Sequence, residues 1–247
     1  MEPIFDALPI PLPVFALLFA TVALGSLVQG TIGFGLNVIA APIAAIVQPD
    51  ALPAAMIIMS LPMTAGAALR ERDHIDRRGV AWTTLGRLPG VALGSFIVAT
   101  LDASELATWI GGMVVVAASM SVMASSIPVT ALPLALAGAV AGFMGTTSSM
   151  GGPPIALLYQ REPGPTLRST LGATFLIGSA LSLAALAVTG HVAPWHWGLG
   201  AALTPAVGLG LVVSRRLHAR VDAGWLRPAV VGFACLAGLA VMLRDLV

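Results

Sequence analysis

Apolar residues dominate this chain in long tracts, and short charged clusters separate the tracts. A helix needs about 20 mostly apolar residues to cross the hydrocarbon core of a bilayer. The pattern predicts an all-α, polytopic membrane protein, because a helix satisfies its own backbone groups in lipid. Six tracts have the length of one span, and we predict helices over roughly Ala51–Leu69, Val80–Leu101, Leu106–Ala124, Ser169–Thr189, His196–Ser214 and Trp225–Leu243.

Two further apolar regions, Leu12–Val47 and Val129–Gln160, are too long for one helix and are interrupted by polar, glycine-rich sequence. The interruptions read Gln29-Gly-Thr-Ile-Gly-Phe-Gly35 and Gly145-Thr-Thr-Ser-Ser-Met-Gly-Gly152. Glycine costs ~1 kcal/mol in a helix, and hydroxyl or amide side chains offer the backbone alternative partners. We therefore predict two hairpins of broken helices, each with an unwound tip, either re-entrant or fully spanning.

The arginines, which are the only basic residues of the chain, predict its orientation in the membrane. Cytoplasmic loops carry an excess of basic residues. The loops that hold Asp50, Asp102 and His191 contain none. If each hairpin returns to the side from which it starts, all the basic loops fall in the cytoplasm and both termini lie outside. These basic loops hold Arg70, Arg72, Arg77 and Arg78, then Arg161 and Arg168, then Arg215, Arg216, Arg220 and Arg227.

The two halves of the chain, residues 1–124 and 125–247, are related in sequence. Pro42-Ile-Ala44 matches Pro154-Ile-Ala156, and Trp109 matches Trp225 at nearly the same spacing. Each half holds one hairpin and three spans, and three is an odd number, so the second half starts on the opposite side of the membrane. The sequence thus predicts two inverted-topology repeats in one transmembrane domain, an arrangement typical of secondary transporters.

Composition narrows the function. Of the 247 residues 57% are hydrophobic and 9% are charged, against roughly 25% charged residues in a soluble domain. This excludes a nucleic-acid-binding protein and makes the lipid bilayer the expected surroundings. No Asp or Glu lies within a predicted span, and no cluster has metal-ligand spacing or joins a nucleophile to a base. We expect neither an enzyme nor a resident cofactor or metal.

The unwound tips form the predicted substrate site, because unpaired backbone groups must be buried in protein or line a polar cavity. Pro153 and Pro154 suit the first turn of a half-helix, whose positive dipole end favours an anion beside the hydroxyl groups. In an inverted repeat the two tips should meet near the membrane centre. The alternative is that the glycines only allow close helix packing. The predicted binding residues at the tips are Gln29, Thr31, Gly33, Gly35, Asn37, Thr146, Thr147, Ser148, Ser149, Gly151 and Gly152.

Arg87 is the only charged residue deep within a predicted span, and its counterpart in the second half is Leu203. An intramembrane charge is costly, so we predict that Arg87 also binds the substrate. The alternative is that its long side chain reaches back to the cytoplasmic interface.

Two segments resemble a known family. Gly25-Ser-Leu-Val-Gln-Gly-Thr-Ile-Gly-Phe-Gly35 with Pro42, and Gly138-Ala-Val-Ala-Gly-Phe-Met-Gly-Thr-Thr-Ser-Ser-Met-Gly-Gly-Pro-Pro154, are similar to the signature segments of the TauE/SafE family, and Arg168-Ser-Thr170 also fits. The resemblance implies a permease of the bacterial inner (plasma) membrane that exports sulfite or organosulfonates such as sulfoacetate, by secondary or facilitated transport. Two alternatives stay open: uptake or exchange of another small anion, and a non-transporting scaffold or sensor subunit. The coupled ion and the oligomeric state, a homodimer included, also stay open.

Overall fold

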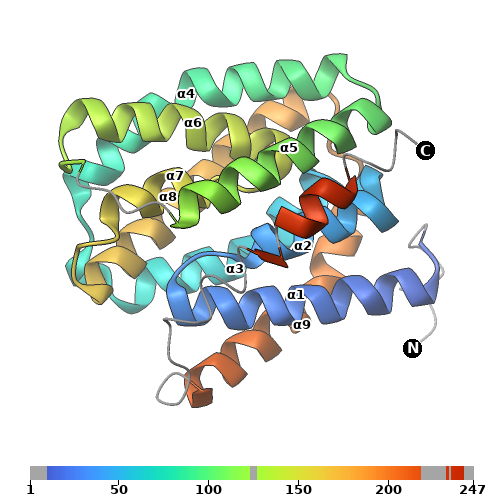
Figure 1. Cartoon of the computed structure of the whole chain (residues 1–247), viewed down its shortest axis with the longest axis horizontal. Coiled ribbons are helices and arrows are strands. Elements are labelled where there is room, and N and C mark those ends of the chain that lie inside the picture. The colour runs from blue at the N-terminus through green and yellow to red at the C-terminus, as the bar shows by residue number, and fades with distance from the viewer. Residues whose placement is uncertain (1–9, 123–126, 218–231, 234, 242–247) are drawn as a thin grey trace.

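The structure, a computed structural model, describes residues 10–122, 127–217, 232–233 and 235–241, and every regular element in these ranges is a helix. The prediction of an all-α membrane protein is confirmed. The helices run roughly side by side along the longest axis (Figure 1). In chain order they are α1 (Leu12–Ile32), α2 (Leu36–Val47), α3 (Ala54–Arg70), α4 (Arg77–Thr100), α5 (Ala103–Val122), α6 (Ala131–Ser148), α7 (Gly152–Tyr159), α8 (Gly164–Val188) and α9 (Pro194–Leu217), with short 3₁₀ turns η1 (Pro49–Ala51) and η2 (Arg72–His74).

Helices occur at the predicted spans that the structure describes. Among the described residues four helical segments are long and apolar enough to cross a membrane, and α3, with 17 residues, is a shorter apolar helix. The prediction at Trp225–Leu243 lies mostly outside the described residues, of which 235–241 are helical. The qualifying segments are Leu12–Thr31, Ala131–Ser148, Gly164–Val188 and Pro194–Ser214.

Both predicted hairpins are present, with shorter breaks than the sequence predicts. α1 and α2 are separated by residues 33–35, and α6 and α7 by residues 149–151. Gly33 ends α1 with φ 91°, a left-handed conformation that favours glycine, and Ser149 ends α6 with φ 59°. We call residues 33–35 the first tip and residues 149–151 the second tip.

The two hairpins open toward opposite ends of the molecule. The residue after α2, Gln48, lines a pocket together with Asp50 and His191. At the end of α7 the hydroxyl of Tyr159 donates to Asp76, 2.7 Å away, directly before the basic start of α4. We call the end that holds the basic loops the arginine end and the other the far end. Inverted repeats require the two hairpins to open toward opposite ends. The inverted relation between the two halves itself stays a prediction.

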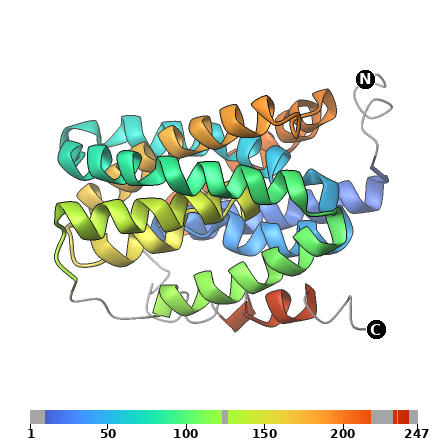
Figure 2. The ribbon, with the colours of Figure 1, turned by 90° about the horizontal axis from the view of Figure 1, so that it is seen from above.

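Each half of the chain packs against the other rather than folding alone. α1 packs against α9, and its equivalent α6 packs against α4, while α3 and α8 contact each other. Figure 1 shows α4 and α6 along one edge of the molecule and α1 along the opposite side, and α4 and α6 lie side by side again in Figure 2. The helices of the two predicted repeats, residues 1–124 and 125–247, thus pack into one bundle. The boundary between the repeats stays a prediction from the sequence.

α4 and α6 pack with their backbones in contact. A Cβ on Gly90 would lie 2.0 Å from the carbonyl oxygen of Ala139, and a Cβ on Gly138 would lie 2.2 Å from the carbonyl oxygen of Thr83. Small residues allow this close approach, which supplies packing energy where lipid removes the hydrophobic driving force. The contact fixes the position of Arg87, one turn before Gly90 on α4.

We predict that Gly90→Ala lowers the free energy of unfolding by about 1–3 kcal/mol, because the added methyl group forces α4 and α6 apart. Gly208→Ala in α9 is the matched control, since nothing lies within 4 Å of a Cβ there. Thermal unfolding of the purified variants in one detergent measures both. Equal melting temperatures for the two variants would contradict the close packing.

Candidate functional site

A cavity of about 60 Å³ lies where the two tips meet. A single water needs roughly 10–15 Å³ on the same measure, so this space holds a few waters or one small ion. Its wall combines both hairpins with one face each of α3, α4 and α8. The lining residues are Gln29, Phe34, Gly35, Asn37, Val38, Ile57, Ser60, Thr64, Arg87, Gly145, Ser149, Met150, Gly151, Gly152, Pro153, Phe175, Gly178, Ser179 and Ser182.

A hydrogen bond joins the start of α2, just after the first tip, to the second tip. The side-chain amide of Asn37 donates from Nδ2 to the carbonyl oxygen of Ser149 at 3.0 Å. Within the first hairpin, Oε1 of Gln29 accepts from the backbone N–H of Leu36 at 3.0 Å, and so caps the first turn of α2. The two hairpins therefore contact each other beside their breaks, and both amide side chains help to hold the interrupted backbone in place.

Arg87 reaches the cavity from α4 and is buried, with 4% of its surface exposed. Its Nη1 donates to the carbonyl oxygen of Thr174 in α8 at 2.9 Å, whereas its buried Nε has no hydrogen-bond partner. Among the described residues the ion pairs are Arg168–Glu71 and Arg72–Asp73, so no carboxylate neutralises Arg87 there. The side chain thus turns into the protein and does not reach back to the membrane interface.

The guanidinium occupies a slot that a missing side chain leaves open. A Cβ on Gly178 of α8 would lie 1.0 Å from Nη1 of Arg87, and a Cβ on Gly151 would lie 2.9 Å from Nη2. A side chain at position 178 would therefore displace the charged group. Gly151 belongs to the second tip, so the guanidinium lies directly against that tip.

The structure brings seven of the predicted binding residues to the cavity wall, namely Gln29, Gly35, Asn37, Arg87, Ser149, Gly151 and Gly152. The other five lie elsewhere. Helical hydroxyl groups in apolar surroundings donate to their own backbone one turn back, which keeps the helix intact. Thr31 donates to Leu27, Thr147 to Phe143 and Ser148 to Met144, Thr146 shares a 2.8 Å hydrogen bond with Ser182, and Gly33 lines a neighbouring pocket.

α3 and α8 also contribute residues to the cavity wall, and the sequence did not predict these. Ser60 and Thr64 lie one turn apart on α3 and face the cavity, a spacing of hydroxyl residues on an apolar helix that could have predicted them. On α8, Ser179 and Ser182 line the wall. The sequence gives no indication that Gly178 belongs to the site, because its role depends on where the side chain of Arg87 ends.

The electrostatics of the cavity favour an anion. Arg87 is the one charged residue among those that line it. α2 and α7 both begin at the wall, and helix N-termini attract negative charge. In α7, however, Pro153 and Pro154 lack N–H groups, so this end offers fewer donors than an ordinary helix. Among the groups of the wall, the guanidinium is therefore the one best suited to an oxyanion, because it is charged and its N–H groups form a planar fork.

A second pocket lies next to the cavity, toward the arginine end of the molecule. A pocket of about 410 Å³, the arginine vestibule, shares Gln29, Thr64 and Phe175 with the cavity. At its rim Arg168 pairs with Glu71 through hydrogen bonds of 2.7 and 3.2 Å. The arginine vestibule thus offers a charged approach to Arg87.

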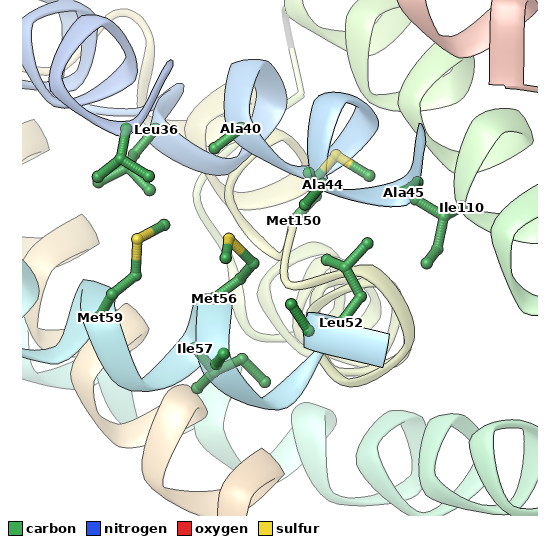
Figure 3. Packing of buried hydrophobic residues seen from close by; sticks show 14 of the residues in the cluster. Leu36, Ala40, Ala44, Ala45, Leu52, Met56, Ile57, Met59, Ile110 and Met150 are labelled. Atoms are coloured by element: carbon green, nitrogen blue, oxygen red, sulfur yellow. The ribbon is translucent and has the colours of Figure 1, made fainter. Parts of the chain in front are cut away.

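An apolar layer closes the opposite route. The far vestibule, the pocket of about 560 Å³ beside Gln48, shares no lining residue with the cavity. Figure 3 shows Met56 of α3 and Met150 of the second tip pointing toward α2, with Ala44 beside Met150. Met56 is fully buried. Leu52 lines the far vestibule, whereas Ile57 lines the cavity on the other side. We call Ala44, Leu52, Met56, Ile57 and Met150 the apolar layer.

Comparison with known proteins identifies one family. The sequence model of the family described as "Sulfite exporter TauE/SafE" matches residues 17–241, almost the whole chain. No curated protein and no solved structure matches the chain. The family match covers both tips and every residue that lines the cavity.

We predict that Gly178→Ala weakens binding of a small oxyanion about tenfold or more, because the new methyl group displaces the guanidinium while the net charge stays constant. Gly112→Ala in α5, where nothing lies within 4 Å of a Cβ, is the control. Titration calorimetry with sulfite measures both variants. If Gly178→Ala binds sulfite as tightly as Gly112→Ala, Arg87 does not hold the anion.

Proposed function

The chain belongs to the TauE/SafE family of sulfite exporters, and we propose that it exports small sulfur-containing anions, sulfite foremost, across the bacterial plasma membrane. The observation that carries this proposal is the buried guanidinium of Arg87, which faces a small cavity and has no carboxylate partner in the described chain. Burying an unpaired charge costs several kcal/mol, and an anion in the cavity would offset that cost.

The two vestibules suggest the route. In our proposal the arginine end is cytoplasmic, both termini are outside, and the two halves are inverted repeats. A cytoplasmic anion then enters the arginine vestibule, passes Arg168 and binds at Arg87, while the apolar layer keeps the outer route closed. Release requires the apolar layer to open and the arginine vestibule to close, as alternating access demands.

The energetics favour export. The cell interior is negative, so one anionic charge that moves outward gains ~2.3 kcal/mol per 100 mV of membrane potential. An exporter of this kind needs no coupled cation, which agrees with a cavity wall that carries no Asp or Glu. The volume of about 60 Å³ supports sulfite, the smaller of the implied substrates, over a longer organosulfonate such as sulfoacetate.

We expect Arg87→Leu to reduce sulfite efflux from proteoliposomes by at least tenfold, because the charge-assisted contact is lost. Arg87→Lys keeps the charge without the fork and should retain an intermediate rate. Leucine already stands at the equivalent position Leu203, fully buried, so Arg87→Leu should fold. Melting temperatures of both variants give the control for folding.

Efflux by Arg87→Leu at the wild-type rate would remove Arg87 from the site. A folded wild-type protein that moves no sulfite, sulfonate or other small anion in either direction would instead favour the scaffold or sensor alternative. Uptake without efflux in oriented vesicles would favour the importer.

The orientation has its own test. In a Cys235→Ala background, which removes the single native cysteine, we expect Thr166→Cys to react with an impermeant thiol reagent only from the cytoplasmic side. A cysteine replacing Thr189, near the far vestibule, should react only from outside. The reverse pattern at both positions would invert the proposed topology.

A further inference from the structure

Two residues that line the cavity each hold a buried polar atom without a hydrogen-bond partner in the described part of the chain: Oδ1 of Asn37 and Nε of Arg87. Buried polar groups are nearly always paired, so an unpaired one at a cavity points to a missing ligand. The two atoms differ in kind. Nε of Arg87 can only donate, whereas Oδ1 of Asn37 can only accept.

The orientation of the Asn37 amide is fixed by its neighbour. Its Nδ2 donates to the carbonyl oxygen of Ser149, which can only accept. A flipped amide would place two acceptors against each other, so Oδ1 must remain on the side away from Ser149. Asn37, one of the residues that line the cavity, therefore keeps an unpaired acceptor in addition to the guanidinium of Arg87.

This acceptor matters for the protonation state of the ligand. A fully deprotonated oxyanion has no donor, so it would satisfy Arg87 and leave Oδ1 of Asn37 facing a negatively charged oxygen. An anion that carries one O–H or N–H group can satisfy both atoms. Leaving a buried acceptor unpaired costs about 1–3 kcal/mol, which converts to roughly fivefold to 100-fold in affinity.

The charge of the wall points the same way. Arg87 supplies the single formal charge among the lining residues, so a monoanion gives a neutral site and a dianion leaves an excess negative charge in low dielectric. We propose that this site selects singly charged oxyanions that carry one hydrogen-bond donor, hydrogensulfite rather than the sulfite dianion. The inference rests on the proposed function of the same cavity, and it means that each exported anion carries one proton with it.

A matched pair of anions tests the donor requirement. Sulfamate and methanesulfonate have the same charge and nearly the same shape, and neither titrates near neutral pH, but only sulfamate carries N–H donors. We expect purified wild-type protein to bind sulfamate about tenfold more tightly than methanesulfonate in calorimetric titrations at pH 7.

Two variants test whether the preference for sulfamate depends on Asn37. Asn37→Leu keeps a similar volume without the acceptor, so the ratio of the two affinities should fall to about one. Ser119→Ala, in α5 and away from the cavity wall, removes a hydroxyl that donates to the carbonyl oxygen of Val115, and it should keep the wild-type ratio. A pH series on the wild type gives a second measurement if Asn37→Leu does not fold. Affinity for total sulfite should then fall as the pH rises above the second ionisation of sulfurous acid, while affinity for methanesulfonate stays constant.

The outcomes distinguish failure of the donor requirement from failure of the proposed function. Equal affinity of the wild type for sulfamate and methanesulfonate would overturn the donor requirement and leave the anion permease standing. Sulfite affinity that stays constant or rises with pH would overturn it as well. If the folded protein binds none of these anions, both the donor requirement and the proposed function fail.

Discussion

The meeting of two interrupted helices is the constraint on which the rest of this structure depends. Backbone groups freed at the tips cannot face lipid, so each hairpin needs the other to cover its break. The hydrogen bond from Asn37 to the carbonyl of Ser149 is the direct link between them, and Gln29 satisfies the start of α2 from within its own hairpin. The cavity exists because these breaks are buried against each other and cannot pack as regular helices.

The charge at the cavity depends on the surrounding packing. Arg87 is held at its depth because α4 lies against α6 with the backbones in contact, and its guanidinium extends toward α8 where Gly178 leaves space. Three separate elements thus determine where one positive charge lies. The position of the charge is set when the protein folds, because helix packing holds the guanidinium in place.

The sequence predicted the hairpins well because their signals are local. Clusters of glycines and polar residues interrupt the apolar tracts, and both breaks lie within the predicted segments. The sequence predicted a longer second tip than the structure has, because it placed the run of hydroxyl residues within the tip. Thr147 and Ser148 look like tip residues, but in apolar surroundings their hydroxyls bond to the preceding turn and the helix continues to Ser148.

Other features could not be predicted, because they depend on tertiary contacts. Whether Arg87 turns inward or toward the interface is decided by the space beside Gly178, which lies in a different half of the chain. Likewise, Ser179 and Ser182 are ordinary small residues of an apolar helix until α8 is placed beside the tips. The side of the membrane that each vestibule faces stays a prediction from the arginine distribution.

The slot at Gly178 also bears on how such a protein can evolve. Because a side chain at position 178 and the guanidinium of Arg87 would occupy the same space, the two positions cannot vary independently. A descendant that lost the arginine would be free to fill position 178 with alanine or serine. Once that happened, a single reversion at position 87 would meet a blocked slot. The loss of the arginine would then be hard to reverse by single substitutions, because position 178 would have to return to glycine first.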